Sequence, residues 1–159
     1  MNMNVLFRMI MFVILAFSLV GCSDDEELIV VPELDVNYAN LNGTWKLVEW
    51  NGQVLPEGVY CYIELDRKAH TFTMYQKFDS MYAKYVTGSY NIEEDIYLGY
   101  IIDGEYDYEN GDWNNSYIVT AFDESTMVWT AKDNKNDVCK YVRCEEVPQS
   151  IKDEARVFE

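Results

Sequence analysis

The chain has 159 residues and carries 28 acidic against 12 basic side chains, a formal net charge of −16, and its length suits a single domain. This charge disfavours nucleic-acid binding, which needs clustered lysine and arginine to neutralise phosphates. It favours solubility, or a cationic partner attracted by the field of the protein. Thirteen tyrosines, seven phenylalanines and four tryptophans favour β-structure, because aromatic side chains fit its half-buried pleated surface.

Residues 1–21 combine a basic N-terminal end with a short apolar run. Arg8 is their one charged side chain, and residues 9–20 are apolar or nearly so. A spanning helix needs about 20 apolar residues, so this run is too short to cross a membrane and has the order of a secretory signal. The sequence Leu19-Val20-Gly21-Cys22 resembles the lipobox of bacterial lipoproteins. The resemblance implies cleavage before Cys22 and a lipid on its thiol, which would hold the chain on a membrane.

Residues 22–40 are expected to form a flexible tether. The acidic run 23–27 directly follows Cys22, and runs of like charge repel and stay extended. This run also resembles the acidic export signal of Bacteroidetes-type surface lipoproteins. Ser23 stands where aspartate would retain a Gram-negative lipoprotein on the inner membrane. We therefore expect a lipid-anchored protein of the outer membrane, exposed at the cell surface.

Residues 41–148 show turn signals at short intervals, with period-two apolar patterns between them, which is typical of an all-β sandwich or barrel. Asn110-Gly111 fits a type I′ hairpin turn, whose two central residues need positive φ. Eight antiparallel strands joined by short turns predict a closed up-and-down barrel, which leaves no strand edge unpaired. The predicted strands cover residues 44–50, 59–66, 70–77, 82–91 with a bend at Gly88, 96–108, 113–122, 126–132 and 137–147.

Residues 149–159 form a C-terminal tail, in which 150–159 is predicted as one short helix. Ser150 and Asp153 have the spacing of a capping box. Ile151, Ala155 and Phe158 would then share one face of the helix.

Three cysteines remain besides Cys22, namely Cys61, Cys139 and Cys144. An exported domain lies in a compartment that permits disulfides, so one bridge and one free thiol are expected. Cys139 and Cys144 are five residues apart, which places them on opposite faces of a regular strand. The expected bridge therefore joins Cys61 to either of the other two. Their spacing does not fit a zinc site.

The segment Asn42-Gly43-Thr44-Trp45-Lys46-Leu47 resembles the opening Gly-x-Trp strand of lipocalins, and more closely that of the lipocalin-like domains of Bacteroidetes lipoproteins. The resemblance implies an eight-stranded lipocalin-like barrel over most of the chain after the tether. It also implies that Trp45 closes the barrel floor under an arginine from the last strand, a position that Arg143 matches. Such a cation–π contact is structural and contributes about 0.5–2 kcal/mol.

The candidate binding residues are aromatic. A barrel of this size is either filled by its side chains or holds one small ligand. We expect Tyr100, Tyr106, Tyr117 and Trp129 to line such a cavity or its mouth, because their rings supply apolar area and their polar tips can orient a ligand. Ordinary core packing is the alternative interpretation of the same residues.

The sequence contains no H-E-x-x-H, G-x-S-x-G or S-x-x-K motif and no phosphate-binding glycine loop. His70 is the single histidine and is expected at the surface or in a turn. Asp103, Glu105 and Asp107 are a weak calcium candidate, because strand alternation also explains them as a solvent-facing side. We therefore expect no enzymatic activity, no cofactor and no resident metal.

The leading functional hypothesis is a lipid-anchored barrel that binds a small apolar or amphipathic ligand. One alternative is an acidic interaction or inhibitor module that docks a cationic protein, and another is a surface whose aromatic rings stack on carbohydrate. Salt separates the first two, because added salt weakens the attraction between exposed charges and leaves apolar binding nearly unchanged.

Overall fold

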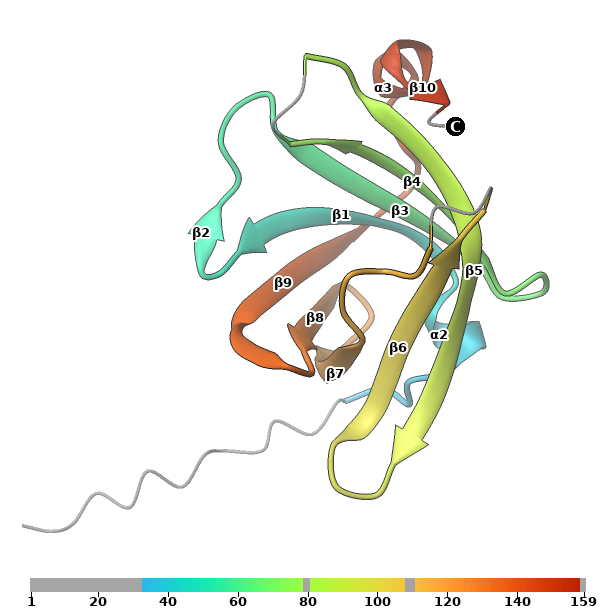
Figure 1. The fold of residues 1–159 in the computed structure, drawn as a ribbon, viewed down its shortest axis with the longest axis vertical. Helices are drawn as coiled ribbons and strands as arrows, with labels where there is room; N and C mark the ends of the chain where they lie inside the picture. Colours follow the sequence, from blue (N-terminus) through green and yellow to red (C-terminus); the bar gives the residue numbers. More distant parts are fainter. Residues whose placement is uncertain (1–32, 79–80, 108–110, 158–159) are drawn as a thin grey trace, which may run out of the picture.

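The computed structural model describes residues 33–78, 81–107 and 111–157, and within them eight strands form a closed antiparallel barrel, which confirms the predicted fold (Figure 1). Each barrel strand pairs with the next along the chain, and the last pairs with the first. The barrel therefore closes on itself within residues 43–144. Its strands are β1 (Gly43–Trp50), β3 (Tyr60–Asp66), β4 (Thr71–Lys77), β5 (Lys84–Asp95), β6 (Gly99–Tyr106), β7 (Tyr117–Phe122), β8 (Thr126–Ala131) and β9 (Asn134–Cys144).

Four short elements accompany the barrel in the part of the chain that the structure describes. The helix α2 (Tyr38–Leu41) precedes β1, and β2 (Gln53–Val54) forms a small hairpin with the end of β1. The helix α3 (Gln149–Glu154) and the strand β10 (Arg156–Val157) follow β9. None of the helices in the described residues has the length and apolar character needed to cross a membrane.

The hairpin between β5 and β6 turns later than predicted. A strand was expected over residues 96–108, but the chain turns at residues 96–98 and β6 begins at Gly99. The Asp95 carboxylate accepts hydrogen bonds from the backbone N–H groups of Tyr97 at 2.8 Å and Leu98 at 3.0 Å. This local turn, which an aspartate side chain stabilises, overrides the strand signal of three apolar residues.

The strand β7 also begins later than predicted, at Tyr117 instead of residue 113. The backbone N–H of Trp113 donates to the Gly104 carbonyl at 2.8 Å, so this residue folds back onto β6. Residues 114–116 then leave the sheet. Asn114 and Asn115 are poor strand formers, which explains the late start. The predicted turn at Asn110-Gly111 lies outside the described residues except for Gly111. Because residues 114–116 leave the sheet, β6 and β7 pair at two positions within the described residues.

Two glycines allow side chains to pack against the inner wall of the barrel. A Cβ on Gly88 would collide with the Glu105 carbonyl and the Phe72 ring, and one on Gly104 would collide with the Trp113 indole. Gly88 does not end its strand, because β5 continues to Asp95. It lies where β5 passes from its pairing with β4 to its pairing with β6. The glycine that predicted a bend therefore lies where one long strand, β5, exchanges β4 for β6 as its pairing partner.

One end of the barrel is closed by Trp45 and Arg143, which we call the barrel plug. Trp45 is fully buried, and its indole N–H donates to the Leu41 carbonyl at 2.9 Å. The Arg143 guanidinium carbon lies 4.1 Å from the Trp45 ring centroid. The guanidinium also donates, at 2.8 Å each, to the backbone carbonyls of Asn40, Asn42 and Glu124. The plug thus joins the entry segment, β1, β9 and the turn after β7.

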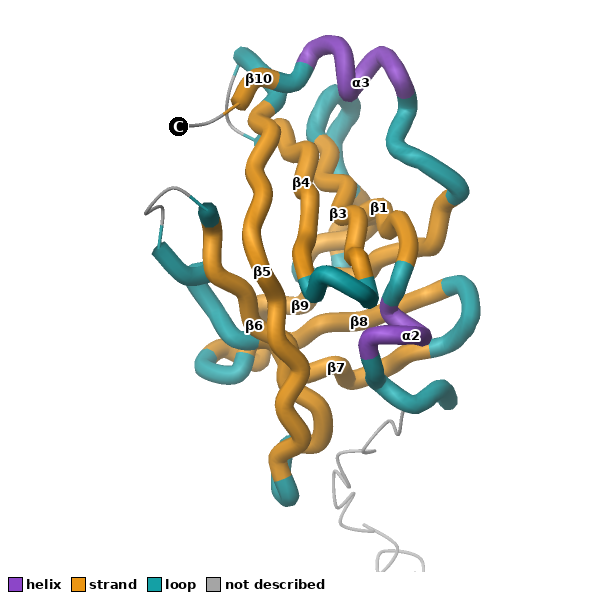
Figure 2. Tube along the Cα trace, turned by 90° about the vertical axis from the view of Figure 1, so that its right-hand side faces the viewer, coloured by secondary structure: helices purple, strands orange, loops and turns teal. Residues whose placement is uncertain are grey.

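The C-terminal helix is shorter than predicted. It ends at Glu154, and β10 follows it (Figure 2). The capping-box prediction is wrong: the N-cap residue is Pro148, and no side chain caps the helix. Ile151 and Ala155 do share a packing surface, which covers tyrosines on the outside of the barrel. Phe158 lies outside the described residues. The strand β10 pairs in parallel with the start of β5.

We expect Arg143→Lys to lower the free energy of unfolding by about 1–3 kcal/mol, because an ammonium group cannot reproduce the planar fork that reaches three carbonyls. Urea unfolding followed by tryptophan fluorescence measures the change. Arg156→Lys is the matched control, since the exposed Arg156 guanidinium lies 4.1 Å from the Tyr82 ring centroid. This substitution should change the free energy by less than about 0.5 kcal/mol. Equal losses in both variants would contradict the structural role of the plug.

Candidate functional site

A cavity of about 290 Å³ lies inside the barrel, and we call it the aromatic cavity. Its wall includes Trp50, at the opposite end of β1 from the plug residue Trp45. No lysine, arginine, histidine, aspartate or glutamate belongs to the lining formed by the described residues. The aromatic side chains of the lining are Trp50, Phe78, Tyr106, Trp113, Tyr117, Trp129 and Tyr141.

Three of the four residues predicted to line a cavity come together here, namely Tyr106, Tyr117 and Trp129. Tyr100 is not in the lining and packs, half-buried, against the core. The prediction missed Tyr141, although alternation along β9 places it on the same face as Arg143. It also missed Trp113, whose position depends on the chain folding back onto Gly104 and is invisible in a strand pattern.

Trp129 is the centre of the aromatic cluster in the wall. Its ring centroid lies 4.8 Å from that of Tyr141 and 5.6 Å from those of Tyr117 and Trp113. The indole nitrogens of Trp129 and Trp113 are buried and have no hydrogen-bond partner among the described residues. By contrast, the Trp50 indole donates to the Asp137 carboxylate at 2.7 Å.

The three described cysteines are free thiols, so the expected disulfide is absent from the structure. Cys61 on β3 and Cys139 on β9 both line the cavity, but β1 runs between their strands. Two strand spacings amount to about 9–10 Å, beyond the roughly 7 Å between Cα atoms that a disulfide spans. Cys144 packs with the tyrosine cluster outside the barrel, on the other face of the wall from Cys61.

Burial keeps the ionisable groups of the aromatic cavity neutral. It raises the pKa of the Cys61 and Cys139 thiols to about 12. It also raises the pKa of Tyr106 and Tyr117, and that of Tyr141 well above its ordinary value. Because desolvation disfavours the charged form of each group, the cavity is a poor environment for any negative charge.

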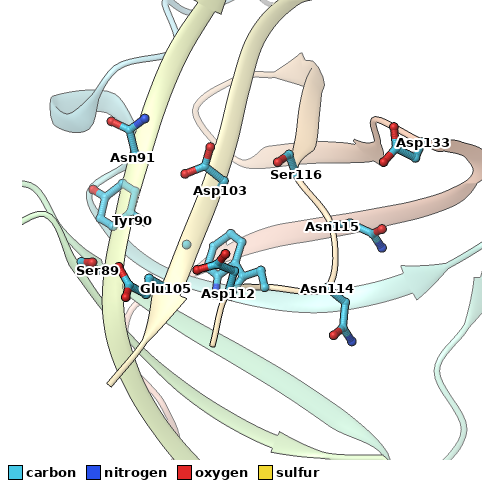
Figure 3. A pocket seen from close by; sticks show the side chains of 12 residues that line it. Ser89, Tyr90, Asn91, Asp103, Glu105, Asp112, Asn114, Asn115, Ser116 and Asp133 are labelled. Carbon is cyan, nitrogen blue, oxygen red and sulfur yellow. The ribbon is translucent and has the colours of Figure 1, made fainter. Parts of the chain in front are cut away.

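A second concavity of about 530 Å³ lies beside β6, where residues 114–116 leave the sheet, and we call it the acidic cleft (Figure 3). Burial, together with the nearby carboxylates of Glu93 and Asp112, raises the pKa of Asp103. No lysine or arginine among the described residues lines this cleft. Its carboxylates belong to Asp103, Glu105, Asp112 and Asp133.

The weak calcium candidate is not assembled in the structure. Asp103 and Glu105 line the acidic cleft, whereas the Asp107 carboxylate accepts a hydrogen bond from the Thr87 hydroxyl. Over the described ranges, no three His, Cys, Asp or Glu side chains are grouped so that they could hold a metal ion. His70 lies exposed in the turn before β4, stacked on Tyr38 with ring centroids 3.7 Å apart.

A small closed barrel with an internal aromatic cavity defines a class of protein that can enclose one small ligand. This chain belongs to the family of lipocalin-like domains, whose family model matches residues 41–129, more than half of the sequence. Members of this family are in general binding proteins and not enzymes. No curated protein and no solved structure matches the chain.

Proposed function

We propose that this protein binds one small apolar or amphipathic molecule in the aromatic cavity, and that a lipid on Cys22 holds it at the outer membrane, exposed at the cell surface. The observation that carries the binding proposal is the cavity itself, a concave volume of about 290 Å³ that is walled by aromatic rings and free of charged side chains in its described lining. Ligand sites of this kind are concave, mostly apolar and furnished with a few polar groups.

The lining has both of the components that such a site needs. Leu47, Met74 and the rings supply apolar area, each Å² of which contributes about 25 cal/mol when it is removed from water. Gln76 and Asn114, which are less buried, add amide groups to the lining. Such amides can orient the polar end of an amphipathic ligand.

Native mass spectrometry of residues 22–159 with Cys22→Ser, purified without detergent, tests the binding proposal. We expect an adduct of one small molecule per chain that is lost on denaturation. Cys61→Phe places a ring in the cavity and should abolish the adduct, whereas Tyr97→Ser, on the exposed hairpin tip, should retain it. An adduct that survives Cys61→Phe in a folded variant would place the ligand elsewhere and contradict the proposal.

The anchoring proposal rests on the lipobox and on Ser23, which lie outside the described residues. With the leader intact, the protein should fractionate with the outer membrane, and Cys22→Ser should release it, because the acyl chains provide the membrane affinity. Cys144→Ser is the matched control and should leave the fractionation unchanged. Membrane retention of the Cys22→Ser protein in immunoblots of separated membranes would contradict a lipid anchor on this residue.

The acidic cleft favours a second candidate function, the docking of a cationic protein segment. Four carboxylates line the cleft, and the whole chain has a net charge of −16. A tetralysine peptide should bind it, with an affinity that falls as salt rises from 50 to 500 mM, roughly the range over which screening becomes strong. The double variant Asp103→Asn, Asp112→Asn should weaken this binding and leave the cavity adduct intact. Salt-independent binding in calorimetry would count against an electrostatic site.

A further inference from the structure

The turn between β5 and β6 carries three consecutive exposed apolar side chains, Ile96, Tyr97 and Leu98, which we call the hairpin tip. They are 87%, 88% and 40% exposed, and none of them packs against the core clusters of the described residues. The Asp95 carboxylate holds the turn through backbone N–H groups, so the turn does not need apolar side chains. A cluster of exposed apolar side chains without a role in packing indicates an interaction site.

The hairpin tip projects beyond the end of the barrel that the plug closes. The strand β4 begins at Thr71, beside the end of β3 and the start of β1, and pairs there with Ser89 of β5. Residues 91–95 of β5 continue past this pair and add about 16 Å of strand. In both Figure 1 and Figure 2 the hairpin accordingly projects downward from the barrel.

The chain enters the barrel on the same side. The first two N–H groups of the entry segment, residues 33–42, donate to the Phe122 carbonyl at 3.0 and 3.1 Å. The Tyr38 hydroxyl donates to the Asn91 side chain and accepts from the backbone N–H of Ile92, at 3.3 Å each. The entry segment therefore lies along the projecting part of β5, and it begins in the lower part of both views, as the hairpin tip does.

The lipid proposed on Cys22 limits how far this side of the barrel can lie from a membrane. Residues 23–32 connect Cys22 to the entry segment. A chain spans at most about 3.6 Å per residue, so the entry segment begins within about 40 Å of the lipid anchor. Such a tether keeps the hairpin tip at a high effective concentration near the bilayer. A contact too weak to bind a free protein is then sufficient.

The chemistry of the hairpin tip fits the boundary between lipid headgroups and acyl chains. Ile96 and Leu98 offer aliphatic surface that acyl chains can cover. Tyrosine is enriched at membrane–water interfaces, because its ring is apolar and its hydroxyl stays hydrated, and Tyr97 supplies both groups. Glu93 and Glu94 are exposed on the same hairpin. Because charged side chains are costly in hydrocarbon, insertion stops at the tip.

We propose that the hairpin tip inserts into the bilayer that holds the lipid anchor, and that this second membrane contact orients the barrel. The inference rests on the proposed function, because it requires the lipid on Cys22. It turns the far end of β1, where Trp50 lines the aromatic cavity, away from the bilayer. The ligand then enters the cavity from the aqueous side.

A fluorescent probe at the hairpin tip tests this orientation in the anchored protein. The full chain with Cys144→Ser, acylated at Cys22 and bound to phosphatidylcholine vesicles, receives a nitrobenzoxadiazole probe at Tyr97→Cys, since Cys61 and Cys139 are buried. We expect the emission to shift to shorter wavelength and to be quenched by nitroxide groups on the acyl chains. Phosphatidylglycerol in the vesicles should reduce both effects, because its charge repels the acidic hairpin.

Two variants are matched controls. Val54→Cys places the same probe on another exposed apolar residue, in the hairpin at the far end of β1, and its emission should remain that of a probe in water. Ile96→Ser with Leu98→Ser, combined with the probe at Tyr97→Cys, should abolish the shift. This variant keeps the turn, because the Asp95 carboxylate binds backbone groups.

The outcomes separate this inference from the function on which it rests. A Tyr97 probe that stays in water while the protein stays on the vesicles overturns the hairpin contact and leaves the lipid anchor in place. A shift at Val54 instead overturns the orientation. A shift that persists without Ile96 and Leu98 overturns it too, because the probe then inserts by itself.

Two further outcomes also count against the inference. A shift that appears without vesicles and grows with protein concentration assigns the hairpin tip to a second copy of the chain and overturns the membrane contact. Protein that leaves the vesicles, and whose Cys22 carries no lipid by mass spectrometry, overturns the proposed anchor itself.

Discussion

The contact between Trp45 and Arg143 lies where the first and last strands of the barrel meet, since these two residues are direct partners in the register of β1 and β9. An up-and-down barrel exists only if that last pairing forms, and it is the pairing between the parts of the chain that are farthest apart in sequence. A guanidinium that donates to three backbone carbonyls beside this pairing stabilises it. The positions of the other strands follow once this seam is closed.

The interior of the barrel is packed differently near the plug and away from it. Near the plug, Trp45, Phe122 and Met127 pack in the interior, and none of the three is more than 2% exposed. Farther along β1, the wall passes through a register shift between Leu47 and Glu49, and the cavity lies in this half of the barrel. Dense packing at one end can thus supply the stability that an incompletely filled interior at the other end lacks.

The sequence predicted the features that depend on local pattern. The alternation of residues 60–66 and 71–77, and the turn in which Asp123 accepts hydrogen bonds from Ser125 and Thr126, appear nearly where they were expected. The Gly-x-Trp resemblance indicated Trp45 and Arg143 as partners. The misplaced starts of β6 and β7 have local causes that compete with alternation, the Asp95 side chain and the departure of residues 114–116 from the sheet. The cavity depends on which interior side chains leave space unfilled, and the alternation of residues along a strand does not carry that information. Tyr100 was predicted to line the cavity and does not, whereas Trp113 was not predicted and does.

The pairing of β10 with β5 has a consequence for how the barrel behaves among its neighbours. The first residues of β5 extend beyond the reach of β6, so the backbone of Lys84 and Tyr85 would offer an open ladder on one side. Arg156 and Val157 occupy that ladder in parallel orientation. An unoccupied strand edge is a template for pairing with another chain, and it leads to aggregation. Arg156 and Val157 thus cover a part of β5 that could otherwise pair with a strand of another molecule.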